Sequence, residues 1–143
     1  MEIFIPGNVP SSKNSKVATS KGIFNSKTVT KYLRSLGIQS YSTSKKTVKG
    51  YVKRLNSFEI LVSPLKEYIY PQSYPIFMSL HFIRNSRRRF DFVNVAQIIL
   101  DLLVAHEVIQ DDDMDHVIPS AYQINGEFYS YDKEHPGVWI YVP

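Results

Sequence analysis

The sequence predicts an α+β fold: one domain, residues 1–143, in which helices pack on a mixed β-sheet. The length of 143 residues suits a single domain with one core. Apolar residues make up 43% of the chain and charged residues 21%, which is typical of a globular protein rather than a disordered one. Runs with the period of a strand and runs with the period of a helix alternate only in part, which favours α+β over regular βαβ repeats.

The N-terminal segment predicts a strand followed by a loop. The strand covers residues 2–5, and the Pro6-Gly7 pair stops it. Residues 11–22, SSKNSKVATSKG, are basic and rich in hydroxyl groups, and they predict a loop.

Two helices are expected before the first long apolar strand. Residues 26–37 show apolar residues at helical spacing, with Ser26 as the N-cap and Gly37 just past the end. A second helix is expected over residues 45–62, and Pro64 should end or kink it. The inward residues are Val29, Tyr32, Leu33 and Leu36 in the first helix, and Val48, Tyr51, Val52, Leu55, Phe58 and Leu61 in the second.

The second half of the chain predicts a central strand and a central helix. Residues 74–83 are nearly all apolar, which is typical of a strand in the middle of a sheet. The remaining expected elements are a basic turn at 85–89, the central helix at 91–105, closing strands at 115–124 and 137–143, and an Asn125-Gly126 turn between them.

Charge is distributed unevenly along the chain, although the net charge is only +4. Residues 1–90 hold sixteen of the seventeen Lys and Arg and three acids, whereas residues 91–143 hold one base and ten acids. Lys and Arg that neutralise phosphates are the usual source of affinity for nucleic acid. A basic region at about 10–90 is therefore expected to contact nucleic acid beside an acidic site at about 91–118. The alternative is a solvated surface with chance clustering.

Several classes of protein are excluded by composition. The chain has no cysteine, which excludes disulfides and thiolate metal sites. Its start, MEIFIPGNVP, does not resemble a cationic leader, and no apolar run approaches the ~18 residues of a membrane span. A cytoplasmic protein without a membrane partner is expected.

Four polar residues share one side of the expected central helix. At about 100° per residue they fall within an arc of roughly 120°. The rest of the helix is apolar, so the helix is expected to be buried in a core or at a subunit interface, with its stripe facing something polar. Metal binding is one role for the stripe; the alternatives are capping by Asp91 and structural hydrogen bonding by Asp101. The stripe comprises Asp91, Asn94, Gln97 and Asp101.

QDDDMDHVIP, residues 110–119, gathers four carboxylates within five positions. A divalent cation would offset their repulsion, and a solvated turn is the alternative. The turn is not a calcium loop, because His116 and Tyr122 stand where that loop needs Gly and Glu. His106 and His116 lack the spaced partners of a zinc site. Oxygen ligands from Asp91 and this turn would suit Mg²⁺ or Mn²⁺.

Residues 84–118 resemble the signature of RusA-type Holliday junction resolvases. That pattern is a basic run, D-x-D-N, a helix with a Lys and a later Asp-apolar-Leu, then an apolar pair and D-D. Pro10, Ser12, Lys13 and Asn14 also resemble the family's P-x-S-K-N loop. The positions that match without gaps are Asp91, Asn94, Asp101-Leu102-Leu103, Val108-Ile109 and Asp111-Asp112.

The resemblance implies a single RusA-like domain that forms a homodimeric, Mg²⁺-dependent endodeoxyribonuclease. Such enzymes are common in phages and prophages, and they resolve Holliday junctions or related branched DNA in recombination and repair. Mn²⁺ is an alternative cofactor. The two-fold axis is expected near residues 92–104 or the sheet edge beside them. Expected site residues are Asp91, Asp112 and Asp111 for catalysis, these three and Asp113 for the metal, and Lys13, Asn14, Lys16, Arg84, Arg87, Arg88 and Arg89 for DNA.

Two positions depart from the family pattern. The second Asp at the helix start is Val93 here, and the helix Lys is Gln97. In an active enzyme Asp113 or Asp115 would replace the carboxylate, and Lys13 or an arginine of 87–89 would replace the cation. The alternative is a non-catalytic or weakly active relative that binds branched DNA. A more distant alternative is a structural protein whose acidic turn contacts a basic partner.

Overall fold

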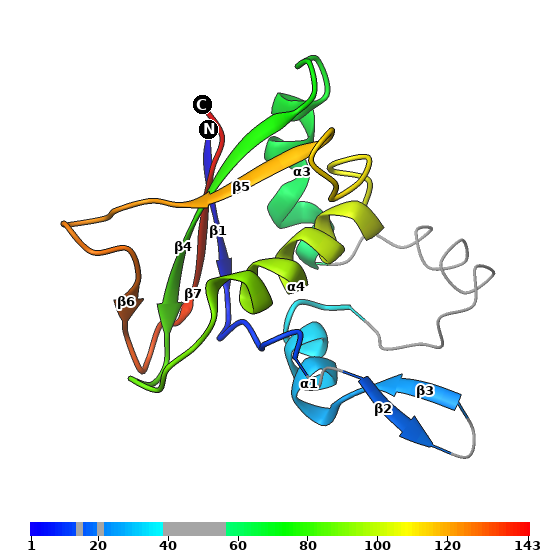
Figure 1. Cartoon of the computed structure of the whole chain (residues 1–143), viewed down its shortest axis with the longest axis vertical. Coiled ribbons are helices and arrows are strands. Elements are labelled where there is room, and N and C mark those ends of the chain that lie inside the picture. The colour runs from blue at the N-terminus through cyan, green and yellow to red at the C-terminus, as the bar shows by residue number, and fades with distance from the viewer. Residues whose placement is uncertain (14–15, 20–21, 39–56) are drawn as a thin grey trace.

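The computed structural model describes residues 1–13, 16–19, 22–38 and 57–143. It has an α+β fold built on a five-stranded mixed sheet, and the predicted fold class is confirmed. A separate two-stranded hairpin precedes α1 (Figure 1). The strands are β1 (Glu2–Pro6), β2 (Lys16–Thr19), β3 (Gly22–Asn25), β4 (Ile76–Arg84), β5 (Val117–Ala121), β6 (Ser130–Tyr131) and β7 (Gly137–Tyr141), and the helices are α1 (Lys27–Ser35), α3 (Ser57–Ile69) and α4 (Phe92–Ala105).

Strand β4 is the centre of the sheet, as predicted. It pairs antiparallel with β7 on one side, and β7 pairs antiparallel with β1. On its other side it pairs parallel with β5 over its first five residues and with β6 at its last two. The parallel β4–β5 pair requires a crossover, which α4 supplies. This crossover returns the acidic turn to the start of β4, where the Ile76 N–H donates to the His116 carbonyl at 2.8 Å.

The core lies between the sheet and its helices. Figure 1 shows α3 and α4 on one side of the strands, and alternate strand residues facing that side are buried. Helix α4 is itself almost enclosed: Leu103 is fully buried, whereas Val93 is 73% exposed. Of the two places in which this helix was expected to be buried, a core or a subunit interface, the core accounts for its buried residues. The buried residues of α4 are Val95, Ala96, Ile98, Ile99, Leu100, Leu102 and Leu103.

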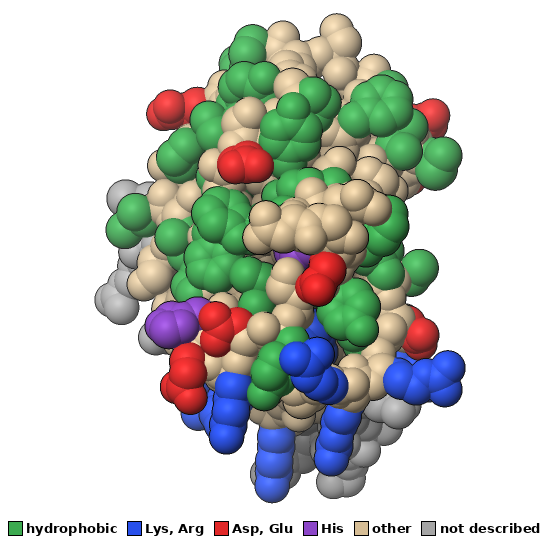
Figure 2. Space-filling model, turned by 90° about the vertical axis from the view of Figure 1, so that its left-hand side faces the viewer, with side chains coloured by type: hydrophobic (Ala, Val, Ile, Leu, Met, Phe, Trp, Pro, Cys, Tyr) green, Lys and Arg blue, Asp and Glu red, His purple; other side chains and the backbone are tan. Residues whose placement is uncertain are grey.

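The opposite face of the sheet carries aromatic and polar side chains. Phe4 packs beside Trp139 with ring centroids 5.0 Å apart, and the Ser79 and Ser120 hydroxyls are 3.1 Å apart. Phe77 on the same face is 59% exposed. Figure 2 shows this side of the molecule, with hydrophobic side chains over much of it and Lys and Arg side chains gathered at its lower end.

Local signals in the sequence correctly predicted the ends of α1. The Ser26 hydroxyl accepts from the Val29 N–H at 3.3 Å, as an N-cap should. Gly37 has a positive φ of 76°, and the Gly37 and Ile38 N–H groups donate to carbonyls of the last turn at 3.0 and 2.9 Å. The Asn125-Gly126 turn is also present, with φ of 52° and 79° and reciprocal hydrogen bonds between Ile124 and Glu127.

Two predictions about the N-terminal half were wrong. Residues 16–19 of the expected basic loop form strand β2 instead, which pairs antiparallel with β3 across the Ser20-Lys21 pair. Of the two effects expected of Pro64, the end of the helix is wrong, because α3 continues to Ile69. A proline cannot donate to the carbonyl four residues earlier, but the Ser63 hydroxyl donates to that Ile60 carbonyl at 3.3 Å.

Other expectations need smaller adjustments. Residues 45–56 of the second expected helix lie outside the described residues. Within α3 Phe58 is buried as expected, but Val62 is buried in place of Leu61, which is only half-buried. Strand β7 was expected to close the sheet but lies inside it, between β1 and β4. No helix in the described part of the chain is long and apolar enough to cross a membrane.

Two glycines offer a matched test of the fold. A Cβ on Gly137 would lie 2.6 Å from the Ile5 carbonyl oxygen, whereas a Cβ on Gly126 would meet nothing within 4 Å but would have to adopt a φ of 79°. Gly137→Ala should lower the free energy of unfolding by about 1–3 kcal/mol, because the added Cβ would overlap Cζ of the Phe4 ring as well as the Ile5 carbonyl, and the carbonyl belongs to the backbone. Gly126→Ala should cost about 1–2 kcal/mol through its backbone conformation.

Asparagine at the same two positions separates the causes in urea denaturation. It should be tolerated better than alanine at residue 126, because Asn adopts a positive φ readily. It should be worse than alanine at residue 137, where space is the limit. The same rank order at both positions would contradict the strand register assigned to β1 and β7.

Candidate metal and nucleic-acid site

Asp91 stands at the N-cap position of α4, but its side chain makes no capping hydrogen bond. Its carboxylate instead accepts from the Asn94 side-chain amide at 3.2 Å. The Ser12 N–H donates to the Asn94 carbonyl at 2.9 Å, which brings the N-terminal loop to the start of α4. Capping therefore does not account for Asp91, whose exposed carboxylate remains accessible to a cation.

The acidic turn folds back onto the polar stripe of α4. The Gln97 side-chain nitrogen donates to Oδ1 of Asp101 and to Oδ2 of Asp112, both at 2.7 Å. Asp101 is thus a structural acceptor, one of the two roles considered for it. A single amide lies between two carboxylates and carries no charge to neutralise them. This arrangement places Asp112 over the stripe that also contains Asp91.

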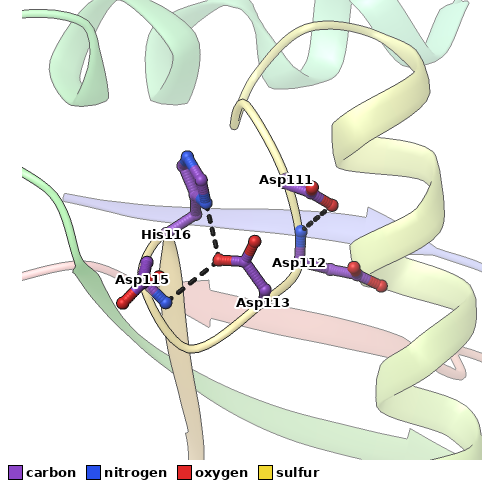
Figure 3. A network of polar contacts seen from close by, with 5 residues as sticks. All are labelled: Asp111, Asp112, Asp113, Asp115 and His116. Carbon is purple, nitrogen blue, oxygen red and sulfur yellow. Dashed lines mark hydrogen bonds and ion pairs between the residues drawn. The ribbon is translucent and has the colours of Figure 1, made fainter.

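Within the turn a second group forms around Asp113. Its Oδ1 accepts from the Asp115 N–H at 3.0 Å and contacts Nδ1 of His116 at 2.6 Å (Figure 3). Ligand atoms of Asp111, Asp113 and His116 lie within 4.8 Å of one another, so these three residues could hold a metal ion. Figure 3 shows the Asp112 side chain directed toward α4, away from this group.

Hydrogen bonding between Asp113 and His116 shifts the pKa of both residues. The bond from His116 lowers the pKa of Asp113, and the bond to Asp113 raises the pKa of His116, with weaker support from the charges of Asp111 and Asp115. The pair is therefore ionised over a wider pH range than either residue alone. A metal ion at this position would compete with the proton on His116.

The structure thus divides the four predicted metal residues into two groups. Asp91 lies at the start of α4, and Asp112 lies in the turn with its side chain bonded to Gln97 of α4, while Asp111 and Asp113 lie in the turn beside His116. His116 was not among the predicted ligands, because the chain has no second histidine at the spacing of a zinc site. The sequence does carry one signal, because His116 stands three residues after Asp113 and residues at this spacing meet in a turn. The turn is present: the His116 N–H donates to the Asp113 carbonyl at 3.0 Å.

The predicted DNA-contacting residues also differ in their surroundings. The Arg84 guanidinium donates to the Val9 carbonyl and lies 4.8 Å from the centroid of the Phe90 ring. Burial lowers the pKa of Arg84, and its bond to Val9 gives this residue a structural role. Arg87 lies 4.4 Å from the Tyr131 ring and is exposed. Lys13, Arg88 and Arg89 are exposed as well, while Asn14 and the Lys16 side chain lie outside the described residues.

Titration of His116 should test the pair. Its pKa in the folded protein should lie above the usual value, and Asp113→Asn should lower it. Asp115→Asn removes an equal charge without removing a carboxylate bond to the imidazole, so its effect should be smaller. The pair's stabilisation should be lost as pH rises through the folded pKa of His116, and lost as pH falls through the folded pKa of Asp113. NMR of the imidazole protons measures this, and equal effects of the two variants would contradict the pairing.

No protein-family model and no curated protein matches this chain. The likeness of residues 84–118 to a resolvase signature therefore rests on the motif residues themselves.

Proposed function

We propose that this protein is a Mg²⁺-dependent endodeoxyribonuclease that acts on Holliday junctions or related branched DNA. The observation that supports this most is the hydrogen bond between Gln97 and Asp112. It brings the acidic turn to the helix stripe that begins with Asp91, although 21 positions separate the two aspartates in the sequence.

Asp91 and Asp112 would hold the Mg²⁺, with Asp111 or Asp113 assisting. Carboxylate oxygens suit Mg²⁺, whereas the imidazole of His116 suits softer ions. Asp91 and Asp112 are therefore better magnesium ligands than the group that contains His116. Bound Mg²⁺ polarises a phosphodiester and lowers the pKa of an attacking water. The amides of Asn94 and Gln97 would orient the two carboxylates, as outer-shell groups do in metal sites.

DNA would be held by charge and shape. The exposed Lys13, Arg87, Arg88 and Arg89 would contact backbone phosphates, which position the protein without reading sequence. Arg84 is left out of this set because its guanidinium is bound within the protein. A two-fold dimer would supply the two sites that symmetric cutting of a four-way junction needs. Its contact would lie away from the buried face of α4, because the chain's own core already covers Leu103 and its neighbours there.

Removing the carboxylate of Asp91 or that of Asp112 should abolish cleavage of DNA but leave its binding intact. Asp91→Asn and Asp112→Asn should each lower Mg²⁺-dependent cleavage of a synthetic four-way junction by more than about 100-fold, since even outer-shell partners of a metal contribute 10–100-fold. Junction binding should persist, because each change removes negative charge near phosphates. Glu134→Gln, in an exposed loop, is the control for loss of one charge. Full activity in both aspartate variants would refute the assignment.

A non-catalytic branched-DNA-binding protein is the second candidate, favoured by Val93 and Gln97. Val93 is 73% exposed, so Val93→Asp should change stability by less than about 0.5 kcal/mol. Gln97→Lys places a cation between Asp101 and Asp112. If the natural chain cuts weakly, the double variant should cut faster by about 10–100-fold. A natural chain that binds junctions but does not cut them, with or without these changes, would favour the binding function.

A further inference from the structure

A small aromatic pocket opens at the edge of β4, in the gap between β5 and β6. It has a volume of about 240 Å³, and five of its six lining residues are aromatic. The gap exists because β5 pairs with β4 only as far as Leu80, and β6 pairs again only from Ile83. The lining residues are Phe82, Phe90, Phe92, Ala121, Phe128 and Tyr129.

The outer wall of this pocket is exposed yet held in place. Phe128 and Tyr129 are 57% and 53% exposed, which is unusual for large rings that pack in a core. The loop that carries them is fixed at both ends by the fully buried His81, which contacts the Tyr122 carbonyl at 3.0 Å and the Ser130 hydroxyl at 2.7 Å. The wall is therefore a positioned aromatic surface facing water.

The rings are arranged with faces at near right angles. The Phe90 and Tyr129 planes meet at 84° with centroids 5.0 Å apart, and the Phe82 and Phe92 planes meet at 78° with centroids 5.8 Å apart. A planar ligand that enters such a pocket can stack on one ring face while meeting the edge of another. A pocket of about 240 Å³ suits one small ring system better than a length of peptide.

Arginine side chains lie beside part of the pocket wall. Arg84 lies over the Phe90 ring, and Arg87 lies over the ring of Tyr131, which follows the pocket wall in sequence. Arg88 and Arg89 are exposed just before Phe90. Aromatic faces combined with a cationic rim are the features that bind single-stranded nucleic acid, where bases stack and phosphates meet arginines.

We propose that this pocket binds one unstacked nucleobase of the DNA. This inference rests on the proposed function and names how its substrate is recognised. Phe90 and Phe92 flank Asp91 in the sequence, so a base in the pocket would bring its own strand to the start of α4. Bases at a branch point are already partly unstacked, which lowers the cost of taking one out of the helix. The pocket would therefore favour branched DNA over intact duplex.

The test compares two single strands with the same phosphates. One is a labelled oligothymidine, and the other is an abasic strand of equal length, so only the first can fill the pocket. Fluorescence anisotropy should show that the natural chain binds oligothymidine about 5- to 150-fold more tightly, the usual contribution of one stacked base. The double variant Phe128→Ala, Tyr129→Ala should lose this preference. Both changes are at exposed rings, and circular dichroism would verify the fold.

Two control variants separate the pocket from its surroundings. Phe77→Ala removes a ring that is 59% exposed but outside the pocket, and it should keep the preference. Replacing Arg87, Arg88 and Arg89 together with alanine should weaken binding of both strands alike and flatten the dependence of affinity on salt.

Each outcome bears on the proposal. Equal affinity of the natural chain for the two strands would overturn the base pocket while leaving DNA binding in place. Preference that survives in the Phe128 and Tyr129 double variant would also overturn it. A double variant that changes only the oligomeric mass would show that a second copy of the chain fills the pocket instead. No binding of either strand at low salt would overturn this inference, and no binding of a four-way junction under the same conditions would overturn the proposed function as well.

Discussion

The bridge made by the Gln97 side chain determines what the acidic part of the molecule can do. Helix α4 is apolar on most of its surface and is buried there, so its polar stripe must find partners at its remaining side. The side-chain nitrogen of Gln97 has two partners: it donates to Asp101 on the same helix and to Asp112 in the turn, each at 2.7 Å. The carboxylates of Asp101 and Asp112, which repel each other, are thereby held on either side of one neutral donor.

That neutrality has a chemical consequence. A lysine at this position would offset the charge of the two carboxylates, whereas an amide orients them without compensation. The excess negative charge remains available to a cation, and Gln97 engages only one oxygen of Asp112. In the turn, the charge of Asp113 is compensated by a residue that can carry a positive charge, because His116 lies 2.6 Å from the Asp113 carboxylate. The two groups are therefore unequal: a protonated His116 supplies a countercharge to Asp113, whereas the neutral amide of Gln97 supplies none to Asp112.

Features decided by local chemistry could be predicted from the sequence, and features decided by distant contacts could not. The caps of α1 at Ser26 and Gly37 follow from backbone conformation and a single hydroxyl, so sequence suffices. The helical stripe followed from periodicity alone. By contrast, Pro64 stays inside α3 with the Ser63 hydroxyl bonded to the carbonyl that the proline leaves free, and the aromatic pocket assembles from four separate segments. The role of His116 depended on the turn that brings it to Asp113.

The position of the pocket and that of the acidic turn are linked through α4. Asp91 and Gln97 are six residues apart, or about 9 Å along a helix axis. Magnesium bonds to oxygen at only about 2.0–2.1 Å, so one ion that contacts both Asp91 and Asp112 requires side-chain movement within this stripe. Asp112 would keep its bond to Gln97 through one oxygen and offer the other to the cation, and a DNA strand drawn to the start of α4 by the aromatic pocket would bring a phosphate to the same place. Substrate and metal would then assemble the site together, with the amide of Gln97 holding the carboxylates until both arrive.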